Sequence, residues 1–439
     1  SVDNGTNAGE AIAAIQASGC DVIVTDHHGT SEDVAEAYAV LNPRLPDAGY
    51  PDRDLAGVGV AFRLVAAVAE SLSHGTTLSP EFRSFLIEAM AYVALGTVAD
   101  VAPLRGENRI LVYHGLRALA ASRNPGIRAL IDSAGLGDRS PTSEDISYRI
   151  APLINAAGRM GSALDAVRLL TAPGYQEAQQ AAAILEQHNL DRRRVEREVI
   201  EEVTAQAKQM EDAVLVLGGE RWHRGVLGIV AARVAETLQK PTLLLSFEGG
   251  FGRGSGRSVR GFHLRNALSR CAEHLLRYGG HHAAVGLEMH ADRLDLLRQG
   301  INRVFAEVQD DTPLLDLDGP AELSELDARD IRKLDMLGPF GPGNPRPVFV
   351  TENVRIVGHP TVDPRGRDLR LRVAKDGVLL PARLHEGAES FEDVRNQNEP
   401  VTLCYTPRLA QWAEDGPVVL HVWHLEPNSN GHQPPPSPP

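Results

Sequence analysis

Runs of β-branched and aliphatic residues alternate with helical stretches in two parts of the chain, and this alternation constrains the fold more than any other feature. In the first part, a helical stretch over residues 7–18 precedes the runs 21–25 (DVIVT) and 39–41 (AVL). In the second, the runs 213–217 (AVLVL) and 242–246 (TLLLS) flank a helical stretch over 227–239. Strands and helices at this spacing predict two α/β regions, the first with a parallel sheet.

The pattern differs in the other parts of the chain. Residues 55–121 are helical in pattern, and a GTVADVAP stretch at 96–103 interrupts them. Residues 174–211 contain few helix breakers and many charges, which predicts a long exposed helix connecting two lobes. After Pro313, short β-like runs separated by Gly, Pro and Asp predict a small β-barrel. These runs lie at 354–357, 369–373, 378–384, 401–405 and 418–423.

Composition excludes several classes of protein. The 44 Lys and Arg against 58 Asp and Glu give a net charge of −14, which excludes a basic protein that wraps DNA but not a local basic groove. Residues 253–277 hold six arginines and one acid, which makes this segment locally basic. The three cysteines lie far apart, and no apolar run approaches the roughly 18 residues of a membrane span. We therefore expect a cytoplasmic protein.

The first residues, Ser1-Val2-Asp3, contain no initiator Met, and Val2-Asp3 has the pattern of the end of a strand. We therefore expect the sequence to be a piece of a longer protein.

One group of residues has the composition of a metal site. Asp3 and Asp26 each follow a β-type run directly, which places them where ligands bind at the carboxyl edge of a parallel sheet. With His27, His28 and Asp100 they form a carboxylate and imidazole set suited to Mn²⁺, Zn²⁺ or Fe²⁺. Adjacent histidines on an extended chain point in opposite directions, so we expect one to bind metal and the other to face the substrate. The alternative is that Asp26 and His27 cap the next element and that Asp100 is a loop residue.

A second candidate site is the segment 254–258 (GSGRS). Its glycines leave backbone amides accessible to an anion, while Ser255 supplies a hydroxyl and Arg257 a bidentate guanidinium. This combination predicts an anion site. The alternative is a flexible surface hairpin. A dinucleotide-binding glycine motif is disfavoured because no strand-turn-helix of the required spacing surrounds it.

Several ordered motifs resemble those of one family. The segments VDNG (2–5), TDHH (25–28), GTVADVAPL (96–104) and GGHHAAVG (279–286) resemble the DHH phosphoesterase superfamily with a DHHA1-type second domain. The further segments LAGVGVAF (55–62), INAAGRM (154–160), HRGVLGIVAARV (223–234), GSGRS (254–258) and PFGPGNPRPVF (339–349) narrow the resemblance to the RecJ family of bacterial single-strand-specific 5′→3′ DNA exonucleases. The resemblance implies hydrolysis of single-stranded DNA to 5′-mononucleotides in recombination and repair.

The resemblance also implies a role for each residue of the metal site. Asp3 would bridge two divalent metals, and His27 and Asp100 would complete the ligand shell of one of them. Asp26 would support the site from behind, and His28 would face the scissile phosphate. The implied chemistry is a two-metal hydrolysis with Mn²⁺ or Mg²⁺.

Substrate contacts follow from the same resemblance. Ser255 and Arg257 would bind the 5′-phosphate and so set the polarity, Asn155 and Arg159 would contact the DNA backbone, and His281 would act near the scissile phosphate. Further DNA contacts are expected from Arg253, Arg260, Arg370, Tyr405 and Trp412. For Tyr405 and Trp412, packing in the barrel core is the alternative to stacking on bases.

The implied domains are a DHH phosphoesterase domain (1–173), a connector helix (174–211), a DHHA1 domain (212–310), an OB-fold barrel (314–428) and a disordered proline-rich tail (429–439). The chain departs from the family pattern in one respect, because it contains no Asp-x-Asp-x-Asp-Gly motif. In the family this motif holds the other metal and would precede residue 1. We therefore expect this polypeptide alone to bind at most one catalytic metal well and to be inactive or nearly so.

Two alternative functions remain open from the sequence. The first is a DHH phosphoesterase that acts on nanoRNA or cyclic dinucleotides, which residues 314–428 and the PFGPGNP segment disfavour. The second is a non-catalytic replisome scaffold, which the retained metal ligands disfavour. The partners implied by the resemblance are single-stranded DNA with a 5′ end, single-strand-binding protein and a RecQ-type helicase, with no membrane.

Overall fold

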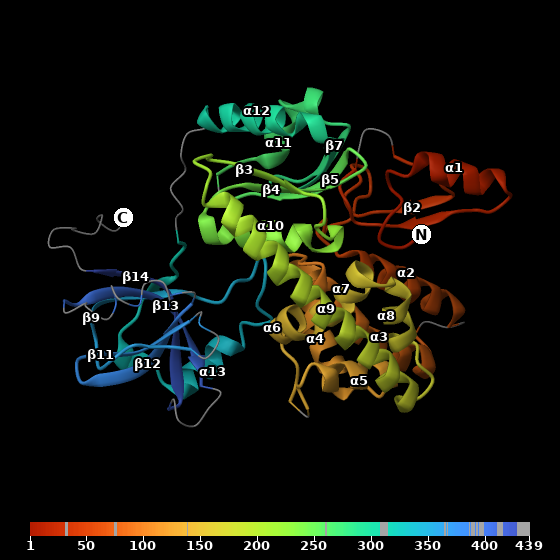
Figure 1. Cartoon of the computed structure of the whole chain (residues 1–439). Coiled ribbons are helices and arrows are strands. Elements are labelled where there is room, and N and C mark those ends of the chain that lie inside the picture. Colours follow the sequence, from red (N-terminus) through yellow and green to blue (C-terminus); the bar gives the residue numbers. More distant parts are fainter. Residues whose placement is uncertain are drawn as a thin grey trace. The chain divides into compact units, whose positions relative to one another are not determined.

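The computed structural model describes residues 1–30, 34–73, 77–137, 139–259, 261–307, 315–363, 366, 368–385, 387, 391, 394, 399–410 and 416–427. The predictions for Arg260, Trp412 and the proline-rich tail lie outside these residues. The fold is mixed α/β, as predicted, and the chain divides into two compact units (Figure 1). One unit is formed by Ser1–Gly115 together with Leu315–Pro439, and the other by Leu116–Leu314.

The first unit begins with a small parallel sheet. Helix α1 (Gly9–Ala17) precedes strands β1 (Ile23–Thr25) and β2 (Ala39–Leu41), which pair in parallel. Val2 forms an isolated parallel bridge with Thr25 on the other edge of β1. The predicted helix and both strands are confirmed.

Three long helices follow, as the pattern over 55–121 predicts: α2 (Gly57–Leu72), α3 (Pro80–Ala99) and α4 (Gly106–Ala121). The interruption begins later than predicted, because α3 continues through Gly96 and ends only at Ala99, with Asp100 as its C-cap. Val101 then adopts a φ of 60°, which turns the chain away from the helix axis.

Helix α3 also corrects the expectation that no segment approaches a membrane span. By length and composition alone it is apolar enough to cross a membrane. It also buries seven residues, among them Leu86, Ala91 and Val98, which is the behaviour of a core helix.

The second unit contains α5 (Pro125–Ser133), α6 (Ser143–Asp145), a π-helical turn (Ile146–Ile150), α7 (Ala151–Met160), α8 (Ala163–Leu170) and α9 (Tyr175–Ala207). The predicted long helix is present as the 33-residue α9. It is not exposed all round, because Leu185, Glu196 and Val203 are among the residues it buries.

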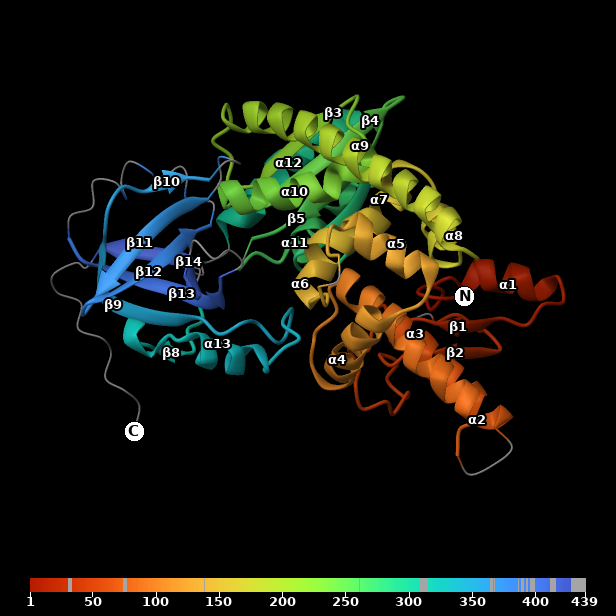
Figure 2. The same cartoon turned by 90° about the horizontal axis from the view of Figure 1, so that it is seen from below.

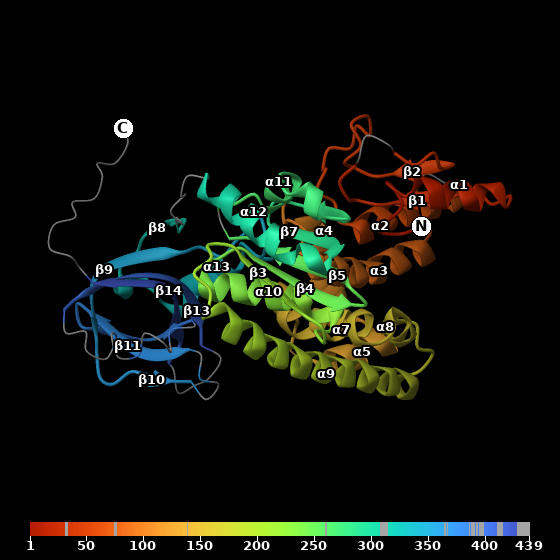
Figure 3. The same cartoon turned by 45° about the horizontal axis from the view of Figure 1, so that its top comes forward.

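A five-stranded sheet completes this unit, in the order β3-β4-β5-β7-β6 (Figure 3). Its elements are β3 (Leu215–Gly219), α10 (Arg224–Leu238), β4 (Thr242–Glu248), β5 (Phe251–Arg257), α11 (Leu264–Ser269), β6 (Arg277–Gly280), β7 (Ala284–His290) and α12 (Leu294–Ala306). Residues of α9 and α10 form a core cluster with Leu215, Leu217 and Leu244, and residues of α11 and α12 form another with Leu243 and Leu245. The segment 254–258, for which a flexible hairpin was the alternative, lies largely in the central strand β5.

The barrel in the first unit is formed by β9 (Phe349–Ile356), β11 (Leu369–Lys375), β12 (Val378–Leu384), β13 (Val401–Leu409) and β14 (Val418–Pro427) (Figure 2). Strand β9 pairs with both β13 and β11 and so closes the ring. The order around the ring is β9-β11-β12-β14-β13, which is the topology of an OB-fold and confirms the prediction. Smaller elements beside it are β8 (Gly319–Pro320), α13 (Ala328–Asp335) and β10 (Thr361–Val362).

Candidate metal centre and phosphate site

The pairing of Val2 with Thr25 determines where Asp3 and Asp26 lie. Asp3 donates its backbone N–H to the Thr25 carbonyl at 2.8 Å, and Asp26 donates its own to Leu41 on β2 at 3.0 Å. Both carboxylates therefore leave the sheet at the carboxyl edge of parallel strands, where ligands bind in open α/β sheets. This agrees with their predicted position.

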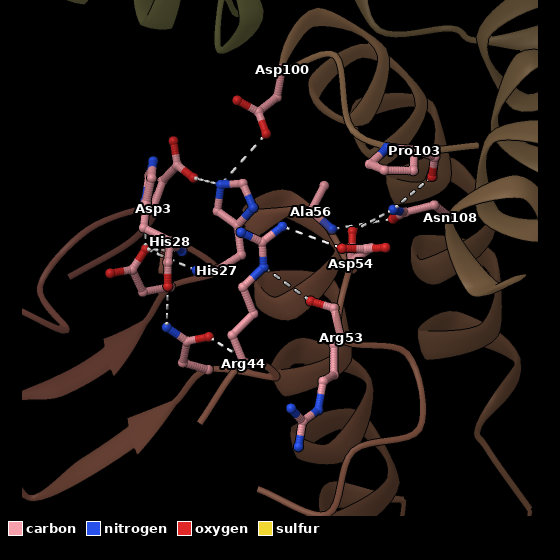
Figure 4. Close-up of polar contacts among 12 residues, drawn as sticks. Asp3, His27, His28, Arg44, Arg53, Asp54, Ala56, Asp100, Pro103 and Asn108 are labelled. Carbon is pink, nitrogen blue, oxygen red and sulfur yellow. Dashed lines mark hydrogen bonds and ion pairs between the residues drawn. The ribbon is translucent and has the colours of Figure 1, made fainter. Parts of the chain in front are cut away.

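The imidazole of His27 faces two carboxylates (Figure 4). Its Nε2 lies 3.1 Å from Oδ1 of Asp3 and 3.5 Å from Oδ2 of Asp100. This nitrogen is buried and makes no hydrogen bond to any described residue. Buried polar atoms nearly always have a partner. A divalent ion bound between the imidazole and the two carboxylates would supply one, so these residues fit a metal such as Mn²⁺.

His28 lies beside this group but is held differently. Asp3, His27 and His28 each offer a ligand atom within 4.8 Å of the others. Nδ1 of His28 is 2.8 Å from Oδ1 of Asp26, and the side chain is about half exposed at 51%. The two adjacent histidines are thus in different surroundings, one buried against carboxylates and one open to solvent.

Asp26 is buried and accepts several hydrogen bonds. Its Oδ2 accepts the backbone N–H of Thr6 at 3.0 Å, and its Oδ1 accepts the backbone N–H groups of His27 at 2.8 Å and His28 at 3.2 Å. Burial alone would raise the pKa of Asp26, but hydrogen bonds from Thr6 and His28 outweigh it and hold that pKa far below its usual range. Asp26 is therefore a fixed anion that orients His28.

The first residue of α2 determines the space around Asp3. A Cβ added to Gly57 would lie 2.2 Å from Oδ1 of Asp3 and 3.2 Å from Cδ2 of His27. Nearby, burial raises the pKa of Asp100, the charge of His27 opposes this shift and the carboxylate of Asp3 adds to it. A bound cation would favour the charged form of both acids.

Two buried asparagines that sequence reasoning missed hold the backbone around the centre. Asn108 accepts the N–H of Ala56 at 3.1 Å and donates to the carbonyls of Asp54 at 2.6 Å and Pro103 at 3.1 Å. It thereby ties the start of α2 to the segment that follows Asp100 (Figure 4). No sequence signal marks this residue, because the groups that it bonds lie up to 54 positions away.

Asn42 plays a comparable part on the other side of the centre. Its Nδ2 donates to Oγ1 of Thr6 and to the carbonyl of His28, both at 3.0 Å. Its Oδ1 accepts the backbone N–H of Arg44 at 2.9 Å, and this hydrogen bond fixes the chain after β2. The Asn-Pro step after an apolar run was a turn signal for this position, although not a functional one.

In the second unit, Ser255 and Arg257 lie on one face of β5, because alternate residues of a strand share a face. Gly228 of α10 lies against both. A Cβ there would be 3.0 Å from an Arg257 guanidinium nitrogen and 3.6 Å from the Ser255 hydroxyl. The structure therefore brings together the hydroxyl and the guanidinium that the sequence singled out.

Arg159 adds a second guanidinium near Arg257. It donates to the carbonyl of Gly225 at 3.0 Å. Burial lowers the pKa of Arg257 and the charge of Arg159 lowers it further; burial also lowers the pKa of Arg159, with Glu196 opposing. No ion pair joins either arginine to an acid in the part of the chain that the structure describes. Two half-buried like charges of this kind favour a bound anion.

The other predicted residues of this unit have mixed surroundings. Asn155 is exposed on α7, one turn before Arg159. Arg253 pairs with Glu288 at 3.0 Å, so part of the predicted local positive charge is neutralised. His281 lies in the turn between β6 and β7, where its N–H donates to the Ala284 carbonyl at 2.8 Å.

The barrel corrects one predicted contact. Tyr405 is fully buried, and its hydroxyl lies 2.8 Å from Oγ1 of Thr351. The prediction that Tyr405 stacks on bases is therefore wrong, because its ring fills the barrel core. Arg370 lies instead on the outer face of β11 and lines a groove of about 840 Å³ together with Arg372, Arg383, Arg408 and His421, among others.

Comparisons with known proteins agree with this architecture. Three family models match in the expected order: the DHH family N-terminal domain over residues 1–94, the DHHA1 domain over 211–307 and the RecJ OB domain over 317–424. The single-stranded-DNA-specific exonuclease RecJ of Haemophilus influenzae is 32% identical over 97% of this chain and 77% of its own length. The Bacillus subtilis protein of that name is 29% identical over 94% of this chain and 54% of its own length.

A solved structure agrees as well. RecJ of Thermus thermophilus in complex with Mn²⁺ superimposes with a TM-score of 0.81 at 29% identity, over 98% of this chain and 61% of that protein. The chain thus spans between about half and three quarters of these relatives. From these matches, the chain belongs to the RecJ family of single-stranded-DNA-specific exonucleases.

Proposed function

We propose that this chain supplies the metal centre, the 5′-phosphate site and the strand-binding barrel of a 5′→3′ exonuclease specific for single-stranded DNA. The observation that carries the proposal is the buried Nε2 of His27, which faces Asp3 at 3.1 Å and Asp100 at 3.5 Å without a hydrogen bond. The names of the relatives, all single-stranded-DNA-specific exonucleases, support the substrate class.

At the metal centre, Asp3, His27 and Asp100 would hold the ion. A bound divalent ion supplies Lewis-acid activation of the phosphodiester and of the attacking water. Imidazole among the ligands favours Mn²⁺ over Mg²⁺, and solved Thermus relatives hold one or the other. Asp26 fixes His28 through Nδ1, so that Nε2 is directed away from Asp26 toward substrate. In its protonated form, with Nδ1–H bonded to Asp26, His28 would donate a hydrogen bond from Nε2 to the scissile phosphate.

The polarity of the reaction follows from the phosphate site. Ser255 and Arg257 bind the terminal 5′-phosphate, and Arg159 adds a second guanidinium. A half-buried pair of arginines binds a doubly charged terminal phosphate more strongly than a singly charged phosphodiester. Ends that carry a 5′-phosphate are therefore the preferred substrate.

Single-strand selectivity is assigned to the barrel. Its groove lies on the strands and loops that OB-folds use for nucleic acid, and four arginines line it. Binding of this kind needs no base readout. Within the cytoplasm, single-strand-binding protein and a RecQ-type helicase are the partners that this function would require to present single strands.

The proposal is tested by metal binding and by end preference. Mn²⁺ titration followed by electron paramagnetic resonance should show binding that His27→Ala abolishes and that the exposed control Asp47→Asn retains. Since this polypeptide alone is expected to be nearly inactive, any residual release of 5′-mononucleotides from 5′-phosphorylated single strands should be lost in the His27→Ala protein. Faster hydrolysis of a dinucleotide than of a long strand would instead support a small-substrate phosphoesterase.

A further inference from the structure

Trp423 presents a fixed aromatic surface to solvent on the outside of the barrel. It lies on β14 and is 49% exposed. Its Nε1–H donates to Oγ1 of the buried Thr406 at 2.9 Å. Because the one polar group of the indole is bonded to this buried hydroxyl, the exposed part of the ring is apolar.

His385 holds this ring from one side. The two rings stack with centroids 5.5 Å apart and planes inclined by 29°. His385 is itself held at both nitrogens, with Nδ1 3.4 Å from Oδ1 of Asp368 and Nε2 3.2 Å from Nδ1 of His421. The aromatic pair is therefore ordered before any ligand binds, which lowers the entropy lost on binding.

Strand register places Trp423 and His385 next to a row of three basic side chains on adjacent strands. Arg370 on β11 is opposite Arg383 on β12, and Arg383 is opposite His421 on β14. Residues two positions further along a strand share its face at a spacing of roughly 7 Å. Along the same outer face, the row that follows consists of Asp368, His385 and Trp423.

The row of Arg370, Arg383 and His421 lies within the 840 Å³ groove. The row of Asp368, His385 and Trp423 lies next to it, outside the groove lining. Arg370, Arg372, Arg383 and Arg408 line this groove in a protein of net charge −14. Arg383 also pairs with Asp368 at 3.6 Å, so its charge is partly neutralised, and the groove is basic mainly through the other three arginines. The matching ligand is a polyanion that also carries flat apolar groups. A single strand of DNA has both, whereas an acidic peptide lacks a regular series of flat rings.

We propose that Trp423, backed by His385, is a stacking platform for a nucleobase of the single strand whose phosphates lie along the cationic groove. This inference rests on the proposed function, since it assumes that the groove binds single-stranded DNA. The platform replaces the stacking role that the sequence assigned to Tyr405.

The test is binding of an oligothymidylate to the full chain in EDTA, which prevents hydrolysis. In a Trp412→Phe background, quenching of tryptophan fluorescence reports on Trp423, because Trp222 is only 3% exposed. The Trp423 variants lack this reporter, so their affinities are compared by the fluorescence anisotropy of a labelled oligothymidylate. Trp423→Ala should weaken binding roughly tenfold or more, while Trp423→Phe should retain most of the affinity. The slope of log Kd against log salt should be unchanged in Trp423→Ala but smaller in Arg370→Ala, because the arginine is proposed to pair with phosphate and the tryptophan is not.

A matched control is Tyr148→Ala, which removes an aromatic side chain that is 77% exposed in the other unit and should leave affinity unchanged. The platform is disproved if the full chain binds the oligothymidylate and Trp423→Ala binds it equally well. A reduced salt slope in Trp423→Ala would also contradict it. If the unaltered chain does not bind single strands, the proposed role of the barrel fails, and the platform fails with it.

Discussion

The side-chain amide of Asn108 lies 3.1 Å from the carbonyl oxygen of Pro103, three residues beyond the metal-site carboxylate Asp100. The same fully buried side chain bonds Ala56 N–H and the Asp54 carbonyl at the start of α2. One asparagine thereby fixes the spacing between the helix that abuts Asp3 and the segment that carries Asp100.

We expect Asn108→Ala to lower both stability and metal affinity. The substitution removes the side-chain partner of one buried backbone N–H and of two part-buried carbonyls, which should cost about 2–4 kcal/mol in the free energy of unfolding. Mn²⁺ affinity should also fall, because the side chain of residue 108 no longer joins the start of α2, which abuts Asp3, to the segment that follows Asp100. Urea unfolding and an Mn²⁺ titration measure the two effects.

Asn124→Ala is the control for this prediction. Asn124 caps α5 in the other unit by accepting the Ile127 N–H at 3.0 Å. Its loss should reduce stability by about 1 kcal/mol without changing Mn²⁺ affinity. Unaltered Mn²⁺ affinity in Asn108→Ala would show that the asparagine serves only the fold.

A second prediction concerns the space beside Asp3. Gly57→Ala would place a methyl group 2.2 Å from the present position of Oδ1 of Asp3, so the carboxylate must move. Alanine is otherwise favourable at the start of a helix, so stability should change little while Mn²⁺ affinity falls at least roughly tenfold. Gly9→Ala is the control, because a Cβ there would meet no atom within 4 Å. Equal Mn²⁺ affinities in the two variants would refute the steric argument.

The positions of two candidate metal residues were predictable because they have a local signal. A carboxylate directly after a β-type run lies at the edge of the sheet, and this rule placed Asp3 and Asp26 beside His27. The short strands separated by Gly, Pro and Asp predicted a small β-barrel, and the family resemblance identified this barrel as an OB-fold.

The residues that were missed or misassigned depend on tertiary contacts. Asn108 bonds groups more than 50 positions away, and Gly57 matters only because Asp3 lies against it. Tyr405 and Trp423 have opposite burial, although both are aromatic residues of barrel strands. Composition could not separate them, because burial depends on which face of the strand points into the barrel.

The third prediction tests the phosphate site. Arg257→Ala should reduce the preference for 5′-phosphorylated over 5′-hydroxyl single strands by roughly tenfold or more, because a charged hydrogen bond to the phosphate is lost. Competition binding with the two oligonucleotides measures the ratio directly. The exposed Arg265, in the same arginine-rich segment, supplies the control variant Arg265→Ala. A similar loss in both variants would indicate a diffuse basic patch rather than a site.

The last prediction separates core packing from stacking at Tyr405. Burial raises the pKa of this phenol to about 12, with the Thr351 hydrogen bond opposing the shift. The unfolded chain ionises near the ordinary value of 10.0, so above this pH it loses protons that the folded chain retains. Stability that is fully present below pH 10 should therefore decline as pH rises toward 12.

Tyr405→Phe should remove this part of the alkaline decline and cost about 1 kcal/mol at neutral pH, because one hydrogen bond is lost. Urea unfolding at neutral and alkaline pH measures both quantities. Affinity for oligothymidylate should stay unchanged in Tyr405→Leu, which removes the ring but keeps an apolar side chain in the barrel core. A large loss of affinity in folded Tyr405→Leu protein would restore the binding role that the burial of Tyr405 argues against.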